Sequence, residues 1–373
     1  LFEESCEKYA DRVAYHNMGA EITFADLEFL SRNFAAALQD MGMEPGDRIA
    51  LMMPNLLQYP VALFGALRAG LVVVNTNPMY TARELRHQLL DSGAKAIIIV
   101  ENFAHVLEEV LEDTAVEHVI ITRMGDMLSP LKGFIINAVV KHVKKMVPPF
   151  RIRNATSFKQ AMKRGSQHHF ETVSSTHDDI AFLQYTGGTT GVSKGAVLTN
   201  RNMVANMQQA SAWIETFIGD QKGIIITALP LYHIFSLTAN CLTFMRFGWL
   251  NYLITNPRDI NGFVKELKST EFHVMTGVNT LFNGLLNHPD FKSIGVGVAR
   301  YGKIYGSFAL VPILLAWVQV SWEIVLFGAE VAFAIQNAAT YRMERGVEGA
   351  SPESRVLLAL SVLCGACHAM VEG

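Results

Sequence analysis

The stretch IALMMPNLLQYPVALFGALRAGLVVVNTNPMYTARELRHQLLDSGAKAIIIV, residues 49–100, carries the strongest signal for the fold class. Short apolar runs alternate in it with longer segments of helical periodicity. The runs are Ile49–Met53, Leu71–Val74 and Ala96–Val100, and the helical segments are Leu57–Arg68 and Ala82–Asp91. Strands that are apolar throughout are expected where helices cover both faces of a sheet. This order therefore predicts an α/β fold, with parallel sheets flanked by helices and joined by right-handed crossovers.

The second helical segment carries its own boundary signals. Thr81 and Glu84 have the spacing of a capping box, in which each side chain bonds the backbone N–H of the other residue. Gly93 stands where a helix C-terminus favours glycine. These residues predict where the helix begins and ends.

A glycine- and threonine-rich stretch, YTGGTTGVSKG, lies further on between two strand-like runs, Ile180–Leu183 and Ala196–Thr199. Glycines let a loop turn tightly and present backbone N–H groups to an anion, while hydroxyl groups and a lysine add further donors. Lys194 is not followed by Ser or Thr at the start of a helix, so the loop is not a Walker A motif. An ordinary turn is the simpler alternative, but this composition favours a polyphosphate site. The candidate ligand-binding residues are Tyr185, Thr186, Gly187, Gly188, Thr189, Thr190, Gly191, Ser193, Lys194 and Gly195.

Strand-like and helical segments alternate again beyond this loop. Strands are expected at Gly223–Ala228 and Tyr252–Thr255, and helices at Asp259–Leu267 and Asn279–Leu286. We expect a first α/β subdomain over residues 1–175, a second one with the phosphate loop over 176–294, and a helical tail over 295–373.

Residues 128–147 form a basic segment with apolar residues at helical spacing. Such a helix can lie on an anionic membrane surface. The alternative is a helix packed on the domain with a solvated basic face.

The tail differs in composition from the rest of the chain. No charged residue occurs from Ile304 to Trp322, and the apolar run continues to Ile335, interrupted only by Glu323 and Glu330. This length predicts a transmembrane segment over residues 304–335, with a buried helix as the alternative. The later motif 364–368 has the C-x-x-C-H spacing of haem attachment, but packed small residues explain it better.

Composition argues against a nucleic-acid-binding protein and against a disulfide-rich one. The net charge is −3, so no overall basic field suggests a nucleic-acid partner. The four cysteines are too few for a disulfide framework and fit a reducing compartment.

Several stretches resemble the adenylate-forming superfamily, and within it the bacterial long-chain fatty-acid–CoA ligases. The resemblance runs from about Leu1 to about Phe291 and includes the phosphate loop and the segments IALMMPNLLQYPVALFGALRAG, TALPLYHIFSLTANCL, LITNPRDI and TGVNTLFNGLLN. It implies ATP with its Mg²⁺, a long-chain fatty acid, and CoA as co-substrate. It also implies catalytic roles for Lys194 and His233, and substrate contacts by His233, Gly277, Val278 and Asn279. For His233, a structural histidine bonded to a backbone carbonyl is the alternative.

Other family segments do not occur in the sequence. These are the adenylate-binding GYG-x-TE, the ribose-binding TGD, the hinge and the mobile C-terminal domain. Turnover by this chain is therefore expected to be weak or absent.

From about Val298 the tail resembles the YihY/BrkB-like inner-membrane family. This suggests a fusion of two truncated coding sequences, at the cytoplasmic face of the bacterial inner membrane. A membrane protein that functions through its tail, and a non-catalytic nucleotide- or fatty-acid-binding fragment, remain open alternatives.

Overall fold

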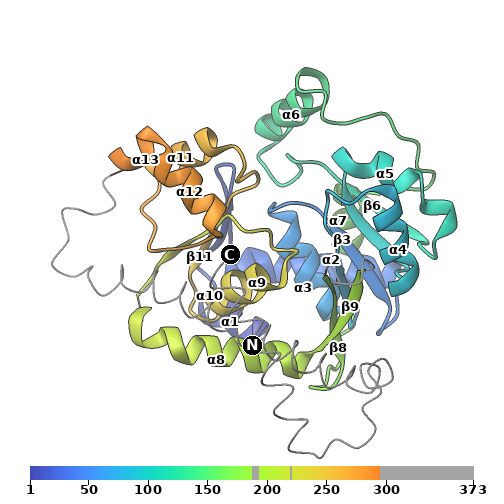
Figure 1. Ribbon diagram of the computed structural model, residues 1–373. Coiled ribbons are helices and arrows are strands. Elements are labelled where there is room, and N and C mark those ends of the chain that lie inside the picture. The colour runs from blue at the N-terminus through green and yellow to red at the C-terminus, as the bar shows by residue number, and fades with distance from the viewer. Residues whose placement is uncertain (187–192, 219–220, 295–373) are drawn as a thin grey trace, which may run out of the picture. The chain divides into compact units, whose positions relative to one another are not determined.

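The segment 49–100 forms the middle of a seven-stranded sheet in the computed structural model, which describes residues 1–186, 193–218 and 221–294 (Figure 1). Its strand order is β7 (Thr156–Ser157), β6 (His118–Thr122), β5 (Ala96–Val100), β3 (Arg48–Met52), β4 (Val72–Asn75), β8 (Ile180–Thr186) and β9 (Lys194–Thr199). All neighbouring pairs are parallel except β8 and β9. The expected βαβαβ order is confirmed for residues 49–100.

Helices cover both faces of this sheet, which explains its continuous apolar strands. Ile49 and Leu51 pack with α2 (Phe24–Asp40), α3 (Gln58–Arg68) and α7 (Phe158–Gly165). Ala50 and Met52, which point the other way, pack with α4 (Ala82–Ser92) and α5 (Ala104–Glu108). Alternate residues of one strand therefore enter two separate cores.

The predicted boundaries of α4 are confirmed at both ends. The Thr81 side chain accepts the backbone N–H of Glu84, and the Glu84 carboxylate accepts the backbone N–H of Thr81. Gly93 ends the helix in the left-handed region, with φ of 59°.

A five-stranded sheet lies beside the first. Its order is β12 (Val274–Thr276), β10 (Ile224–Thr227), β11 (Leu250–Leu253), β1 (Val13–Asn17) and β2 (Ala20–Thr23). Only β1 and β2 are antiparallel. Helices α11 (Ile260–Lys268) and α12 (Asn279–Asn287) pack on one face of it. The expectation of purely parallel sheets is corrected, because each sheet is mixed at the end formed by a hairpin.

The two sheets draw on both halves of the chain. Strands β8 and β9 follow residue 175 but join the first sheet, whereas β1 and β2 come from the N-terminus and join the second. Residues 1–294 form one compact unit. The two subdomains expected on either side of residue 175 are thus interleaved.

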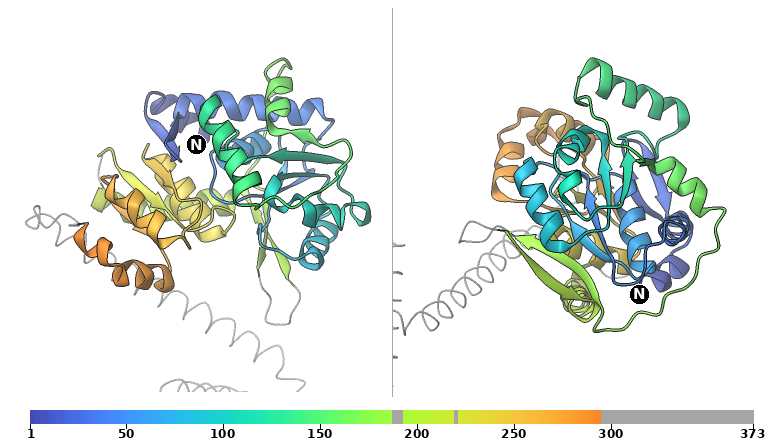
Figure 2. Two further views of the ribbon diagram at one scale, coloured as in Figure 1. Left: turned by 90° about the horizontal axis from the view of Figure 1, so that it is seen from above. Right: turned by 90° about the vertical axis from the view of Figure 1, so that its right-hand side faces the viewer.

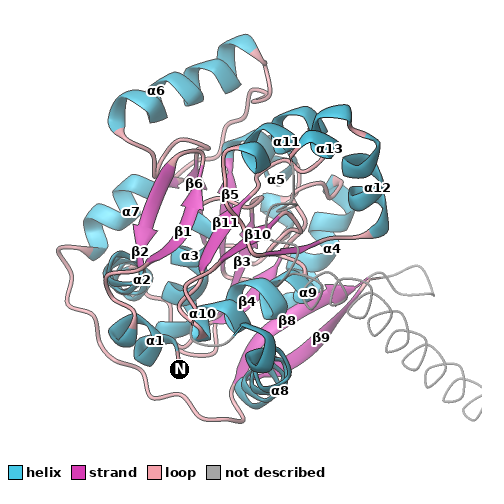
Figure 3. Ribbon diagram, turned by 90° about the vertical axis from the view of Figure 1, so that its left-hand side faces the viewer, coloured by secondary structure: helices cyan, strands magenta, loops and turns pink. Residues whose placement is uncertain are grey.

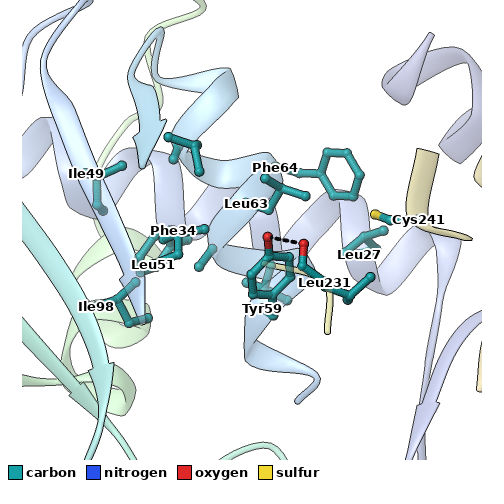
Figure 4. Close-up of a cluster of buried hydrophobic side chains, with 14 of the residues drawn as sticks. Leu27, Phe34, Ile49, Leu51, Tyr59, Leu63, Phe64, Ile98, Leu231 and Cys241 are labelled. Atoms are coloured by element: carbon teal, nitrogen blue, oxygen red, sulfur yellow. Dashed lines mark hydrogen bonds between the residues drawn. The ribbon is translucent and has the colours of Figure 1, made fainter. Parts of the chain in front are cut away.

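One apolar cluster spans the space between the sheets. Figure 4 shows Tyr59 of α3 among its members, with its hydroxyl bonded to the carbonyl oxygen of Leu231. Other members come from distant parts of the chain: Leu27, Phe34, Ile49, Leu51, Leu63, Phe64, Ile98 and Cys241. This shared core fixes the loop around Leu231 against the first sheet.

The remaining helices lie around these layers (Figures 1 and 2). They are α1 (Phe2–Lys8), α6 (Pro130–Ala138), α8 (Asn200–Ile218), α9 (Ile234–Ser236), α10 (Thr243–Arg246) and α13 (Pro289–Ser293). Two π-helical turns continue helices, at Val139–Val143 and Leu237–Leu242. Within the described residues, no helix combines the length and apolarity needed to cross a membrane. The candidate span 304–335 and the motif 364–368 lie outside those residues.

Candidate active site

Strands β8 and β9 pair as a hairpin and flank the glycine-rich stretch in the sequence. Thr186 pairs with Lys194 as the last described pair, and the Ser193 hydroxyl donates to the Thr186 carbonyl at 2.9 Å. The side chains of Thr186 and Lys194 are exposed there. The loop residues Gly187, Gly188, Thr189, Thr190 and Gly191 lie outside the described residues. We call these described residues at the end of the hairpin, Tyr185–Thr186 and Ser193–Gly195, the neck of the expected phosphate loop.

Helix α4 anchors this neck through two side chains. His87 Nε2 donates to the Ser193 carbonyl oxygen at 2.8 Å. The Tyr185 hydroxyl donates to the Asp91 carboxylate at 2.6 Å. Burial and the neighbouring Asp91 raise the pKa of Tyr185, so its hydroxyl keeps the proton that it donates.

Tyr185 also explains why glycine occupies position 195. A Cβ at Gly195 would lie 2.9 Å from the Tyr185 ring, so only glycine allows the ring to lie over that backbone. The geometry gives Tyr185 and Gly195 a structural role in the neck. Their expected contact with a ligand stays a prediction.

His233 lies in the loop that follows the carboxyl end of β10. Its Nδ1 accepts the backbone N–H of Phe235 at 3.4 Å, at the start of α9. The side chain keeps an exposed edge, but neighbouring protein removes enough water to lower the pKa of His233 below its ordinary value. A neutral ring with an acceptor at Nδ1 carries its proton on Nε2, and that N–H can donate to a ligand oxygen.

A chain of buried amides joins the phosphate-loop neck to the His233 loop. Gln184, directly before Tyr185, donates from Nε2 to the Tyr232 carbonyl oxygen at 3.1 Å. Its Oε1 accepts from Asn75 Nδ2 at 3.1 Å. Asn75 Oδ1 accepts in turn from the Tyr59 hydroxyl at 2.7 Å. These bonds bring two predicted site segments together, although 48 residues separate Gln184 from Tyr232.

The sequence interpretation did not single out Gln184 or Asn75. Each follows an apolar run in its strand, and both are buried. A buried polar side chain requires hydrogen-bond partners, and that requirement was the available signal. The identity of the partners could come only from the fold.

Gly277, Val278 and Asn279 connect β12 to α12. Strands β12 and β10 are parallel neighbours, so this turn and the His233 loop leave the same edge of the second sheet. Val278 is 52% exposed, and a Cβ at Gly277 would meet the Phe282 ring at 3.0 Å. The glycine thus serves the close packing of the turn, while Val278 presents an apolar side chain outward.

Buried polar contacts fix this edge. The Thr276 hydroxyl donates to Asn240 Oδ1 at 2.9 Å, and Asn240 Nδ2 donates to the Thr227 hydroxyl at 3.1 Å. Thr227 and Thr276 are the last residues of β10 and β12. The two loops that carry expected site residues therefore start from connected positions.

We next consider whether the described residues contain a metal site. Within the described ranges, no three His, Cys, Asp or Glu side chains lie close enough together to hold a metal ion.

The described residues that flank the glycine- and threonine-rich stretch thus lie beside a loop at the carboxyl end of a parallel strand. The chain belongs to the AMP-binding enzyme family, whose sequence pattern matches residues 2–345. This match extends past residue 291, where the resemblance was expected to end. The comparisons do not support the YihY/BrkB-like interpretation of the tail, since the AMP-binding match itself reaches residue 345.

The curated relatives name a more specific activity. The long-chain-fatty-acid–CoA ligase of Salmonella typhimurium is 54% identical over 329 residues, which cover 88% of this chain and 59% of that protein. The ligase of the same name from Haemophilus influenzae is 54% identical over 297 residues, which cover 79% of this chain and 53% of the relative. The chain therefore spans somewhat more than half the length of these proteins.

A solved structure shares the fold. The anthranilate CoA ligase AuaEII in complex with anthranoyl-AMP aligns with a TM-score of 0.65 at 18% sequence identity, covering 78% of this chain and 51% of that one. This comparison supports the α/β fold with mixed sheets.

Proposed function

We propose that this chain activates a long-chain fatty acid with ATP and transfers the acyl group to CoA. The names of its curated relatives give the substrate class. The observation that carries the proposal is the Gln184–Tyr232 hydrogen bond, because it holds the phosphate-loop neck beside the His233 loop. A nucleotide site and an acyl site must be adjacent for the first reaction.

The reaction has two balanced steps. A carboxylate oxygen of the fatty acid attacks the α-phosphorus of ATP, and the bond to the bridging oxygen breaks to release pyrophosphate. The thiolate of CoA then attacks the acyl carbon, and AMP leaves with the electron pair of the carbon–oxygen bond. The mixed anhydride makes this second attack possible because AMP is a far better leaving group than oxide.

The residues of the proposed site have distinct tasks. Lys194 and the loop beyond Thr186 hold the β- and γ-phosphates, where fixed cationic and N–H donors offset developing charge. Mg²⁺ arrives bound to ATP. The neutral His233 ring donates from Nε2 to an oxygen of the acyl carboxylate or the phosphoryl group. Gly277, Val278 and Asn279 line the acyl side.

ATP binding by the purified chain tests the nucleotide part of the proposal. Isothermal titration with Mg-ATP is expected to show one site, and Lys194→Ala is expected to weaken binding by about tenfold or more, because it removes a charge-assisted contact. Lys222→Ala, at an equally exposed lysine outside the site, is the control. Absence of ATP binding, or equal effects of both substitutions, would refute the assignment of the loop.

Pyrophosphate exchange tests the chemical part. We expect oleate-dependent ATP–pyrophosphate exchange by this chain, because exchange reports formation of the acyl-adenylate. His233→Ala is expected to lower this exchange without weakening ATP binding. Vigorous exchange that survives His233→Ala would show that the ring has no part in the reaction.

A further inference from the structure

Helix α6 and the residues after it, hereafter the α6 segment (residues 130–147), expose an unusual amount of apolar surface. Five large apolar side chains are at least half exposed within this short stretch: Leu131 (73%), Phe134 (73%), Ile135 (52%), Val143 (73%) and Met146 (50%). Nowhere else in the described part of the chain do so many exposed apolar side chains occur so close together in sequence. Exposed apolar surface concentrated in this way marks an interaction site.

Small and polar groups hold the helix in this orientation. Gly133 packs directly on the backbone of Gly125, whose carbonyl oxygen leaves no room for a Cβ. The backbone N–H of Gly125 donates to Asn137 Oδ1 at 2.8 Å, and Asn102 Nδ2 donates to the Met146 carbonyl oxygen at 3.0 Å. Gly133 is the only buried residue of α6, and its apolar side chains are exposed or only partly buried.

An ordinary surface helix buries its apolar stripe, whereas α6 leaves large apolar side chains exposed. Leu131, Phe134 and Ile135 stand at i, i+3 and i+4, so they share the outward face. Figures 2 and 3 show α6 at the margin of the compact unit, away from the other helices. The helical part, Pro130–Val143, is about 20 Å long, too short to cross a bilayer but long enough to lie along its surface.

Charge around the segment points to the partner. Residues 127–170 contain nine Lys and Arg and no Asp or Glu, in a chain whose net charge is −3. Lys141, Lys144 and Lys145 are exposed in the same segment, and Lys132 is exposed with its Nζ beside Gly19 of the β1–β2 turn. An apolar row with flexible lysines beside it matches the acyl boundary and the anionic headgroups of a bilayer. A nucleic acid would leave the apolar row uncovered, because only Phe134 among these residues can stack on a base.

We propose that the α6 segment docks this protein on anionic membrane surfaces, with Leu131, Phe134 and Ile135 inserted at the headgroup–acyl boundary. The lysines lie at the level of the phosphates. Docking uses no residue of the ATP site, so its test is independent of the proposed ligase reaction.

Hydrogen exchange with vesicles locates the contact on the full chain. Phosphatidylglycerol vesicles are expected to slow amide exchange in peptides covering residues 130–147, and phosphatidylcholine vesicles are expected to leave it unchanged. Slowed exchange elsewhere but not in this segment would overturn the proposal, even if the chain binds vesicles through another region. Protection by an acidic protein but not by phosphatidylglycerol would assign the surface to a protein partner and would equally overturn it.

Two sets of variants separate the apolar and charged contributions. Leu131→Ser/Phe134→Ser/Ile135→Ser and Lys141→Glu/Lys144→Glu/Lys145→Glu are each expected to weaken binding of the α6 segment to phosphatidylglycerol vesicles by at least about tenfold. Matched controls lie on distant exposed surfaces: Phe29→Ser for the apolar set, and Lys222→Glu/Lys265→Glu for the charged set. Because all the altered side chains are exposed, the variants should fold. Equal vesicle-induced protection in wild type and both triple variants would refute the proposal.

Discussion

The side chain of Gln184 connects three parts of the molecule with one amide. Its Oε1 accepts a hydrogen bond from Asn75 of β4, its Nε2 donates one to the Tyr232 carbonyl oxygen, and it lies directly before Tyr185 in β8. Because Gln184 is buried, no water replaces these bonds when they are lost. Its role is to position the two loops on either side.

Gln184→Leu keeps a similar volume and removes the amide. We expect it to lower the free energy of unfolding by about 2 kcal/mol, since the Tyr232 carbonyl and the Asn75 amide lose their partners. Urea denaturation measures this loss, and Mg-ATP titration should show weaker binding. Gln209→Leu on the exposed face of α8 is the control. Unchanged stability in Gln184→Leu would contradict the positioning role.

His16 makes stability depend on pH. Its ring stacks on Tyr252 with centroids 4.2 Å apart, and its buried Nδ1 has no hydrogen-bond partner among the described residues. Burial lowers the pKa of His16; Lys132 acts in the same direction, and Glu21 opposes them. The unfolded chain thus binds the proton more readily, so the stability contributed by neutral His16 is present above its ordinary pKa and is lost as pH falls below it.

His16→Phe preserves the stacked ring and removes the titration. The difference in unfolding free energy between pH 7 and pH 5 is therefore expected to be smaller in His16→Phe than in wild type. Chemical denaturation at the two pH values measures it, with exposed His177→Asn as the control. An unchanged difference would show that His16 titrates alike in the folded and unfolded states.

Helix α4 is the element that supports the phosphate-loop neck. His87 and Asp91 both reach the hairpin from its last two turns, and the capping box fixes its first turn. Thr81→Ala removes the cap and should lower the unfolding free energy by about 1 kcal/mol. Thermal or urea unfolding measures this, and Thr81→Ser should restore most of it. A loss in Thr81→Ala that Thr81→Ser does not recover would point to the threonine methyl group instead.

Elements with strong local signals could be predicted from the sequence. The runs at β3, β4 and β5 were recognisable because both of their faces are apolar, and α4 carried explicit caps at both ends. By contrast, the sequence left open whether the apolar row of α6 is exposed or packs on the domain. Its periodicity is that of any amphipathic helix, and the contact between Gly125 and Gly133 that turns it outward depends on tertiary packing.

Some residues of the candidate site could likewise be recognised from local sequence, whereas others depend on tertiary contacts. Lys194 and His233 were suggested by local motifs, but the link through Gln184 and Asn75 joins segments that are distant in sequence. The residues near Gln184 in sequence do not indicate that it bonds Asn75 and Tyr232. That contact depends on β4 and β8 being neighbours in the first sheet. The antiparallel hairpins β1–β2 and β8–β9 likewise became evident only from the topology.

At the scale of the whole molecule, Asn55 holds the two sheets together. It follows β3 of the first sheet, donates from Nδ2 to the Thr227 and Leu229 carbonyls, and accepts the backbone N–H of Leu231. Each of these bonds is made to the chain around β10 of the second sheet. One side chain thus satisfies three backbone groups across the boundary between the sheets.

Asn55→Ala leaves those buried groups without partners and should lower the unfolding free energy by about 3 kcal/mol. Guanidinium denaturation followed by Trp fluorescence measures the change, since Trp249 lies on the second sheet's side. Asn33→Ala, on the α2 surface, is the control. A loss no larger than that of the control would show that the shared apolar core alone joins the sheets.

The pairing of β1 with β11 has a consequence for biosynthesis. Asn17 bonds the carbonyl of Leu253, which is made 236 residues later. While the ribosome is still translating the intervening segment, the nascent hairpin β1–β2 lacks the neighbour that covers the free edge of β1. An unpaired strand edge invites association with other chains, so the β1–β2 hairpin must be shielded, by chaperones or by transient collapse, until β11 has been synthesised.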